Sequence, residues 1–325
     1  MRLLVTGGLG FIGSHFVEYE IQKNCEIEVW DSATYAGSLE NLSNSTRESV
    51  KIKILDISDN HIVKSAIKNS GYFDLIVNFA AESHVDRSII NPNKFIISNV
   101  IGVCNLLEIV REGFAGGFIQ ISTDEVYGSI LNGSWDENSL LAPRSPYSAS
   151  KASADLLTLS YGSTFGLTSV ITRSANNFGP KQSMEKFIPK VIHCLKNSLP
   201  IPVYGDGLYS REWIYVNENV NVISELIHRF PSHLGIYNIG GFELTNIELI
   251  NMIAKFMSID NPNIQYVPDR LGHDRRYSVD STRVLTVLNK SSSGINLIGF
   301  QETIDWYLNN SDWVSRSLAK IKEMK

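Results

Sequence analysis

Cysteine is scarce in this chain of 325 residues, which contains only three: Cys25, Cys104 and Cys194. They lie far apart, and no CxxC pair or Cys/His cluster occurs along the sequence. An odd number of widely spaced cysteines argues against a disulfide framework, and the missing ligand pairs argue against structural zinc. We therefore expect three reduced, buried thiols and no bound metal.

Positive charge is not in excess either, because 29 Lys and Arg residues stand against 34 Asp and Glu residues, a net charge of −5. Nucleic-acid binding generally needs a basic face, so this balance argues against it, although a few arginines could still hold a diphosphate. No apolar run approaches the roughly 18 residues of a membrane span. Residues 3–5 run directly into glycines and are too short for a signal peptide. We expect a cytoplasmic protein with no membrane partner.

The composition itself is that of an ordinary globular protein, with 43% hydrophobic and 19% charged residues. The first half alternates short apolar runs with longer amphipathic ones, as βαβ units do. We expect strands at 2–6, 27–31, 51–55, 75–79, 118–122 and 169–173, and helices at 11–23, 59–69, 92–112 and 147–165. Several of these strands lack polar alternation, which is typical of a parallel sheet covered by helices on both faces. The pattern predicts an α/β fold with a Rossmann-type, doubly wound parallel sheet.

A glycine-rich run, TGGLGFIG at 6–13, follows the first expected strand and opens a helix. Gly7 permits a tight turn, Gly10 lets the backbone approach a pyrophosphate, and Gly13 allows close packing of helix on strand. The diphosphate would sit at the helix N-terminus, near the amides of Phe11 and Ile12 and the positive end of the helix dipole. The run therefore predicts a dinucleotide site.

Several residues after later strands extend this site. Asp31 lies 18 residues after Gly13, close to the roughly 20 expected of a carboxylate that accepts hydrogen bonds from a ribose. Such a carboxylate repels a 2′-phosphate, so the sequence favours NAD over NADP. Asp56 and Ile57 could flank the adenine, although Asp56 could equally be a helix N-cap or turn residue. Ala80 and Ala81 are small enough to let the backbone approach the cofactor.

A tyrosine and a lysine four residues apart, Tyr147 and Lys151, lie on one face of an expected helix. The ammonium is expected to favour the phenolate and lower the tyrosine pKa, making the tyrosine a base. About twenty residues earlier, Asp124 and Glu125 follow a buried strand. An oxidation needs only the tyrosine and lysine, whereas two adjacent carboxyls supply the acid and base that eliminating water next to a ketone requires.

Together these residues are similar to the extended short-chain dehydrogenase/reductase superfamily, and within it to the dTDP-glucose 4,6-dehydratase family. The resemblance runs in order from residue 2 to about residue 282. Besides GxxGxxG and YxxxK, it is carried by AAESHVDRSI at 80–89, STDEVYG at 122–128, PVYGDG at 202–207, REW at 211–213 and LGHDRRY at 271–277.

The resemblance implies a lyase that uses tightly held NAD as a regenerated catalyst. Tyr147 would remove the C-4 hydroxyl proton of the sugar while hydride leaves C-4, with Thr123 bonding the same oxygen and Lys151 tuning the tyrosine. Glu125 would take the C-5 proton, and Asp124 would protonate the departing C-6 hydroxyl. Hydride return to C-6 would then give a 4-keto-6-deoxy sugar.

The resemblance also implies a substrate site for a nucleotide-diphosphate sugar and a place for Asn99 beside the cofactor. Asn99 could order a water or kink its helix, and a helix-interior Asn without function is a comparable alternative. Arg275 and Arg276 could equally be a surface charge run. The implied substrate residues are Glu82, Thr123, Asn177, Glu185, Lys186, Arg211, Asn246 and Tyr277, with Arg211 as a diphosphate clamp.

These roles complete the domain prediction. Residues 1–173, with parts of 214–240, would bind NAD, and residues 174–213 and 241–325 would form a smaller, loop-rich lobe for the nucleotide sugar. Apolar stripes on more than one face of the helices at 99–112 and 149–165 predict a homodimer. The alternatives are a UDP-sugar dehydratase or a 4-epimerase on the same scaffold, and a catalytically silent NAD-binding scaffold.

Overall fold

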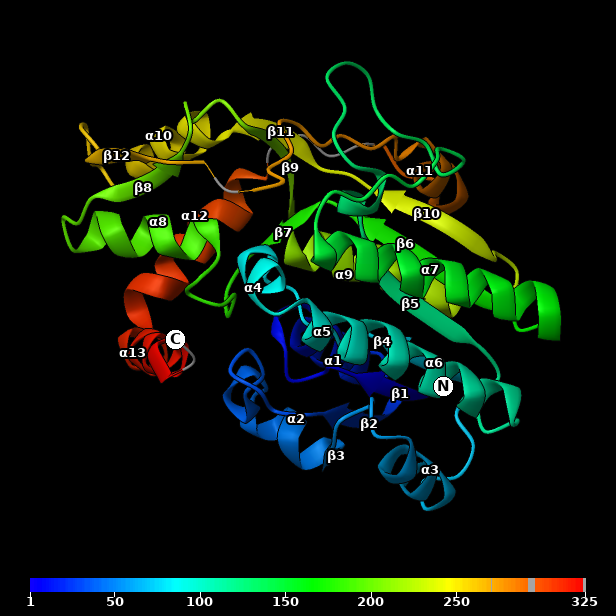
Figure 1. Cartoon of the computed structure of the whole chain (residues 1–325). Helices are drawn as coiled ribbons and strands as arrows, with labels where there is room; N and C mark the ends of the chain where they lie inside the picture. The colour runs from blue at the N-terminus through cyan, green and yellow to red at the C-terminus, as the bar shows by residue number, and fades with distance from the viewer. Residues whose placement is uncertain (270, 292–295, 324–325) are drawn as a thin grey trace.

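The computed structural model describes residues 1–269, 271–291 and 296–323. Seven parallel strands form the main sheet in the order β10-β6-β5-β4-β1-β2-β3 (Figure 1). Reversal of the strand order between β1 and β4 confirms the Rossmann-type, doubly wound sheet. The strands span β1 Arg2–Thr6, β2 Glu26–Asp31, β3 Lys51–Ile54, β4 Leu75–Asn78, β5 Phe118–Thr123, β6 Ser169–Ser174 and β10 Gly235–Ile239.

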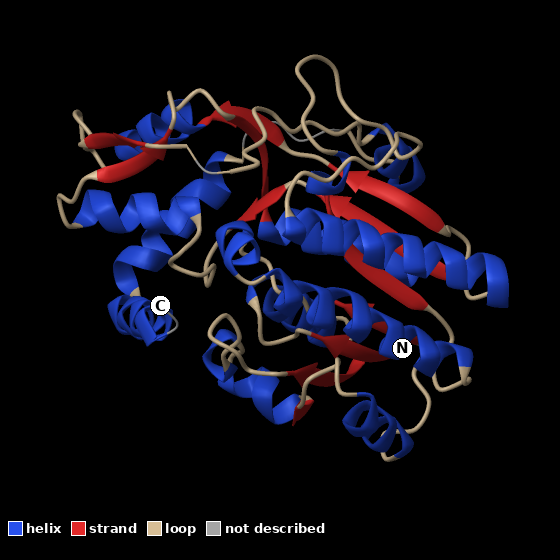
Figure 2. Cartoon of the chain, in the orientation of Figure 1, coloured by secondary structure: helices blue, strands red, loops and turns tan. Residues whose placement is uncertain are grey.

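All six expected strands are present, with ends that differ by at most one residue. Their apolar residues point alternately to two separate cores, which explains why no polar alternation is seen. In β1, Leu3 and Val5 pack in the core that also holds residues of α1 and α9, whereas Leu4 packs in the core beneath α3, α6 and α7. Figure 2 shows the strands lying between these helices. Strand β10 was not expected, because it follows the region where the sequence pattern loosens.

Three of the four expected helices are close to their predicted ranges, the one at 92–112 is divided, and α2, α4 and α9 were not expected. That stretch is divided into α5, a π-helical turn η2, and α6, with the buried Asn99 inside the π-helical turn. Single π-helical turns inserted in helices are frequent at functional sites. The helical segments of this domain are α1 Phe11–Gln22, η1 Leu39–Asn41, α2 Asn44–Ser49, α3 Asn60–Lys68, α4 Val85–Ile90, α5 Pro92–Ile96, η2 Ile97–Ile101, α6 Gly102–Arg111, η3 Asp124–Tyr127, α7 Pro146–Phe165 and α9 Val216–His228.

The helical stretch 92–111 is the one segment of the described chain that is long and apolar enough, by length and composition, to cross a membrane. The sequence reading missed it because polar residues such as Asn99 and Asn105 interrupt its apolar run. It packs against α3 and α7, and 44% of its most apolar window is buried in the fold. The stretch therefore packs on the fold along one side and keeps an apolar outer face.

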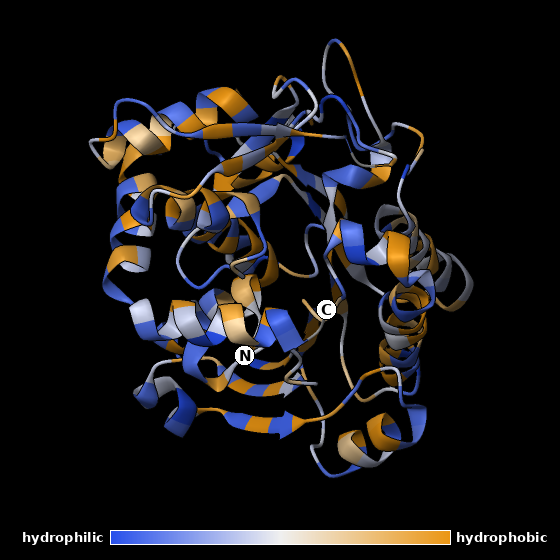
Figure 3. Ribbon diagram, turned by 60° about the vertical axis from the view of Figure 1, so that its left-hand side comes forward, coloured by the Kyte–Doolittle hydropathy of each residue, from blue (hydrophilic) through white to orange (hydrophobic). Residues whose placement is uncertain are grey.

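A smaller part of the structure lies beyond the carboxyl ends of the sheet strands (Figure 1). It contains a three-stranded sheet in the order β11-β9-β7 and a parallel pair, β12 and β8. Hydrophobic residues follow the strands of both parts and form stripes on the helices (Figure 3). We propose that the two lobes keep the boundaries predicted above. The elements of this part are β7 Asn176–Phe178, α8 Phe187–Lys196, β8 Ile201–Tyr204, β9 Ser210–Tyr215, β11 Phe242–Thr245, α10 Asn246–Phe256, β12 Ile264–Val267, α12 Leu297–Asn309 and α13 Ser311–Glu323. The remaining helix, α11 Thr282–Leu288, packs against β10 and α9 of the sheet domain.

Candidate active site

The glycine loop between β1 and α1 is built around close backbone contacts. Gly7 has a φ of +71°, and a Cβ on it would lie 2.4 Å from the backbone nitrogen of Ala80. A Cβ on Gly13 would lie 2.2 Å from the carbonyl oxygen of Gly7. Gly10 is the N-cap of α1 and provides no side-chain cap, so the first amides of the helix, at Phe11 and Ile12, face the loop. The turn and packing roles predicted for Gly7 and Gly13 are confirmed, and this cradle fits a dinucleotide diphosphate.

Asp31 is buried at the carboxyl end of β2 and holds the glycine loop in place. Its two carboxylate oxygens accept hydrogen bonds from the Leu9 amide at 2.9 Å and the Ala33 amide at 2.8 Å. Burial raises the pKa of Asp31, and the two amides oppose that shift. Each oxygen retains a second lone pair, which leaves acceptor capacity for a ribose hydroxyl.

The other predicted cofactor residues line the same edge of the sheet. Asp56 accepts from the Ser58 amide at 2.8 Å, so it is a turn residue, and Asp59 is the residue that caps α3. Ile57 is buried against Gly102, where an added Cβ would lie 2.7 Å from its side chain. Ala80 and Ala81 follow β4, with Ala80 against Gly7. Contacts of these residues with NAD stay predictions.

Tyr147 and Lys151 lie in the first turns of α7, which opens with a capping box at Ser145. The Lys151 ammonium is buried and donates to the carbonyl oxygen of Ile121 at 2.5 Å. Burial lowers the pKa of Lys151 to about 8. Burial also raises the pKa of Tyr147, and the negative charge of Glu125 raises it further. The expected lowering of the tyrosine pKa by Lys151 is therefore not seen in the protein alone, where burial and the charge of Glu125 raise that pKa.

The residues after β5 lie beside this tyrosine. Thr123 caps the short helix η3, and its hydroxyl hydrogen-bonds to Asp124 at 3.1 Å and is within hydrogen-bonding reach of Tyr147. Asp124 is 1% exposed, and its Oδ2 has no hydrogen-bond partner among the described residues. Burial raises the pKa of Asp124 well above its usual value, and the charges of Glu125 and Glu212 add to the rise. The structure thus brings Thr123, Asp124, Glu125 and Tyr147 together, with Lys151 one turn further along α7, and the raised pKa of Asp124 favours the protonated carboxyl.

Asn99 hydrogen-bonds to the backbone of the loop that follows β4. It accepts from the Glu82 amide at 2.8 Å and donates to the Glu82 carbonyl oxygen at 3.0 Å and to Ser150 on α7 at 2.8 Å. The Glu82 carboxylate pairs with Lys94 at 2.7 Å. The π-helical turn therefore aims Asn99 at the loop after β4, and its predicted cofactor contact stays a prediction.

Glu185 and Lys186 join the second lobe to the loop after β4. Glu185 pairs with Arg87 at 3.1 Å, and Lys186 donates to the Ser83 carbonyl oxygen at 2.7 Å. The Arg87 guanidinium also lies 4.2 Å from the centre of the Tyr35 ring. Arg87 and Tyr35 were missed by sequence reasoning, although Arg87 lies inside the quoted motif at 80–89.

Arg211 and Tyr277 form the opposite wall. The Arg211 guanidinium donates to the Asp274 carbonyl oxygen at 2.7 Å and lies 4.4 Å from the centre of the Tyr277 ring. The Tyr277 hydroxyl donates to the buried Asp274 carboxylate, which also pairs with Arg144 at 3.2 Å. Burial raises the pKa of Tyr277, with the Glu125 charge next in effect, so this wall adjoins the catalytic carboxyls. Asp274 and Arg144 were also missed, because their proximity depends on loops 130 residues apart.

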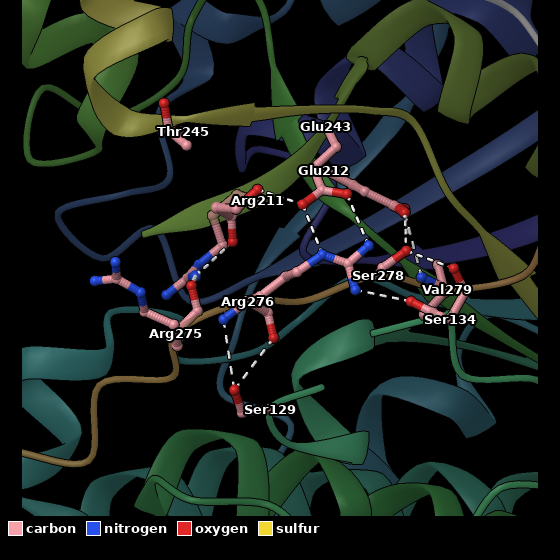
Figure 4. Close-up of polar contacts among 12 residues, drawn as sticks. Ser129, Ser134, Arg211, Glu212, Glu243, Thr245, Arg275, Arg276, Ser278 and Val279 are labelled. Atoms are coloured by element: carbon pink, nitrogen blue, oxygen red, sulfur yellow. Dashed lines mark hydrogen bonds and ion pairs between the residues drawn. The ribbon is translucent and has the colours of Figure 1, made fainter. Parts of the chain in front are cut away.

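Carboxylates pair with the two neighbouring arginines, and Figure 4 shows the pair of Arg276 and Glu243. Arg276 makes two parallel contacts with Glu243, at 2.7 and 2.8 Å, whereas Arg275 points away and pairs with Asp206 at 2.7 Å. Glu212, beside Arg211, accepts from the Ser278 hydroxyl at 2.6 Å. The surface-charge alternative is thus favoured for Arg275 and Arg276, because both are paired at partly exposed positions.

Two predicted substrate residues have mainly local bonds. Asn177 donates to the Ala175 carbonyl oxygen at 3.0 Å and accepts from Asn219 at 2.8 Å. Asn246 opens α10, and its amide donates to the Tyr209 carbonyl oxygen at 3.0 Å. Their contacts with substrate stay predictions.

Comparison with known proteins shows the family to which this chain belongs. Residues 4–290 match the family described as GDP-mannose 4,6 dehydratase. This chain belongs to that family. A family relative from Haloferax volcanii, the low-salt glycan biosynthesis protein Agl12, is 42% identical over 316 residues, covering 96% of this chain and 100% of the relative.

Solved structures agree with this membership. A double mutant of the dTDP-glucose 4,6-dehydratase DesIV from Streptomyces venezuelae, crystallised with NAD, has a TM-score of 0.92 and 40% identity, covering 98% of this chain and 100% of that one. A UDP-glucose 4-epimerase from Thermus thermophilus, in complex with NAD, has a TM-score of 0.87 and 28% identity, covering 95% and 100%. The resemblance stated from the motifs is confirmed, and the dehydratase is the more similar of these two structures.

Proposed function

We propose that this protein is an NAD-dependent lyase that dehydrates a nucleotide-diphospho-glucose, dTDP-glucose, to the 4-keto-6-deoxy sugar. The observation that carries the proposal is the burial of Asp124 between Thr123 and Glu125, beside Tyr147 and one helical turn from Lys151, where burial and the neighbouring carboxylates raise the pKa of Asp124. A general acid must hold its proton at working pH, and burial next to a second carboxyl achieves this.

Each side chain then has one task. When bound, NAD would supply the hydride acceptor and the positive charge of its oxidised ring. Tyr147, bonded to Thr123, takes the proton of the C-4 hydroxyl as a phenolate, and the positive charges of Lys151 and bound NAD would oppose the burial that raises its pKa in the protein alone. Glu125 removes the C-5 proton made acidic by the ketone, while Asp124 gives its proton to the C-6 hydroxyl, which leaves as water. The proton on Glu125 later returns to C-5.

The carboxyl pair separates this function from the 4-epimerase alternative. Epimerisation needs only oxidation and reduction at C-4, so a buried acid beside a second carboxyl has no task there. A silent scaffold is disfavoured because the tyrosine, the lysine and the cofactor cradle are all in place.

The test is product analysis by mass spectrometry and NMR after incubation with dTDP-glucose in D₂O, with UDP-glucose in parallel. We expect loss of one water and deuterium at C-5. Glu125→Gln and Asp124→Asn should each slow product formation by about 10²- to 10⁴-fold. The exposed Glu48→Gln variant is the matched control and should keep full activity. Unchanged turnover in Glu125→Gln, or a C-4 epimer as product, would overturn the assignment.

We also propose a homodimer formed through the outer faces of α5 to α7. Ile97 is 52% exposed and Leu156 57% exposed there. Further exposed apolar residues on the same helices and on α4 are Ile90, Ile96, Ile101 and Phe165. An apolar patch of this kind is typical of a protein interface. Light scattering should give twice the chain mass, and Ile97→Glu with Leu156→Glu should give monomers. A monomeric wild type at micromolar concentration would refute the dimer.

A cytoplasmic site of action is part of the same proposal. The three cysteines are all free thiols, as is usual in reducing compartments.

A further inference from the structure

Three possible metal ligands meet at the edge of the sheet opposite the catalytic residues. Glu20 lies in the last turn of α1, Cys25 lies in the turn that leads into β2, and His228 is the last residue of α9. Helices α1 and α9 pack against each other. Because β2 begins at Glu26, the cluster is at the amino ends of the strands, whereas Tyr147 reacts at their carboxyl ends.

The three donor atoms are already close together. One carboxylate oxygen of Glu20, Oε2, lies 3.2 Å from the Cys25 sulfur and 2.8 Å from Nε2 of His228. All three donors lie within 4.8 Å of one another. The second oxygen, Oε1, is buried and has no hydrogen-bond partner within the part of the chain that the structure describes, although Glu20 is 0% exposed. An unsatisfied buried carboxylate oxygen is costly, and a cation would satisfy it.

We propose that Glu20, Cys25 and His228 bind one zinc-type divalent cation that joins α1 to α9. Thiolate, imidazole and carboxylate are the three ligand types that Zn²⁺ uses in proteins, and Mg²⁺ or Ca²⁺ would not select a thiolate. Three protein ligands leave a fourth tetrahedral position for water on the side of His228, whose side chain is 34% exposed.

The charges and protons of this site balance. The carboxylate of Glu20 and the thiolate of Cys25 neutralise the two positive charges of the cation, while His228 binds as neutral imidazole. Binding releases the thiol proton, and any proton shared by His228 and Glu20, to solvent.

No sequence motif predicts such a site. Glu20 and Cys25 are five residues apart, but His228 is 203 residues further on, and only the packing of α9 on α1 brings it to the other two. The expectation of no metal rested on missing local pairs, which cannot report ligands contributed by separate helices.

The test is titration of the tag-free, full-length protein with Co²⁺ and then Zn²⁺. Co²⁺ should bind at one equivalent with a thiolate-to-cobalt charge-transfer absorption, which Zn²⁺ abolishes by competition. Cys25→Ser should lose that absorption, whereas Cys194→Ser, which removes another buried thiol, should keep it.

A second variant separates metal binding from folding. His228→Gln, at a solvent-exposed helix end, should keep the wild-type circular dichroism but weaken Zn²⁺ binding by at least about tenfold. Zn²⁺ should raise the Tm of the wild type and not that of His228→Gln. Absence of the charge-transfer band, its survival in Cys25→Ser, or equal Zn²⁺ affinity in His228→Gln would each overturn the site.

Discussion

Replacing Gly7 by alanine tests the geometry of the cofactor loop. Gly7 has a φ of +71°, and an added Cβ would lie 2.4 Å from the nitrogen and 2.7 Å from the Cα of Ala80. These neighbours are backbone atoms at the end of a central strand, so they cannot rotate away as a side chain could. Gly113 is a matched control, because its φ is +83° and its Cβ would meet nothing within 4 Å.

Both substitutions carry the cost of a positive φ, and only Gly7→Ala adds a steric clash. A left-handed conformation costs a non-glycine residue about 1–2 kcal/mol, and the smaller entropy of the unfolded chain offsets about 0.4–1 kcal/mol. Gly113→Ala should therefore lower the free energy of unfolding by about 1 kcal/mol. Gly7→Ala adds overpacking, about 1–3 kcal/mol, for a total loss of about 2–4 kcal/mol.

Urea unfolding gives the stability difference, and isothermal titration with NAD gives the functional one. We expect Gly7→Ala to weaken NAD binding at least tenfold, equivalent to about 1.4 kcal/mol, because Ala80 and the loop must separate. Gly113→Ala should bind NAD normally. Equal destabilisation by the two variants, or unchanged NAD affinity in Gly7→Ala, would refute the close-contact reasoning.

Three further predictions concern buried polar groups. Burial puts the folded-state pKa of Lys151 at about 8, below the ordinary 10.5, so the unfolded chain binds more protons between these values and stability should rise with pH there. Lys151→Met should therefore raise the free energy of unfolding by roughly 3 kcal/mol at pH 7. This gain should become smaller at pH 11, and an equal gain at both pH values in urea unfolding would contradict the reasoning. Asp155 pairs with Arg173 at 2.9 Å, and both side chains are at most 2% exposed. Asp155→Asn should lower the free energy of unfolding by about 3–5 kcal/mol. Adding Arg173→Met should recover part of that loss in a double-mutant cycle, whereas additive losses would argue against the pair. Asn99→Ala should speed exchange of the Glu82 amide hydrogen measured by NMR, and unchanged protection would rule out its role in holding that loop.

Six strands and most long helices of residues 1–173 were predictable because each depends on neighbouring residues. The glycines at 7 and 13, the apolar run of β1 and the spacing of Tyr147 and Lys151 are local patterns, and all are where the sequence placed them. The π-helical turn around Asn99 was not predictable, because its side chain is drawn inward by Glu82 and Ser150 from other segments.

The sequence predicted which residues form the site, but not the pKa values of their side chains. The motifs alone were enough to predict that Tyr147, Lys151, Asp124 and Glu125 share a site, because their order and spacing are local properties of the chain. The raised tyrosine pKa could not be predicted in this way, since desolvation depends on everything packed around the group. Two further contacts likewise depend on segments distant in the chain, namely the hydrogen bonds of Arg211 with Asp274 and of His228 with Glu20. Local patterns encode the elements, whereas burial and long-range contact set the charge states and the unexpected clusters.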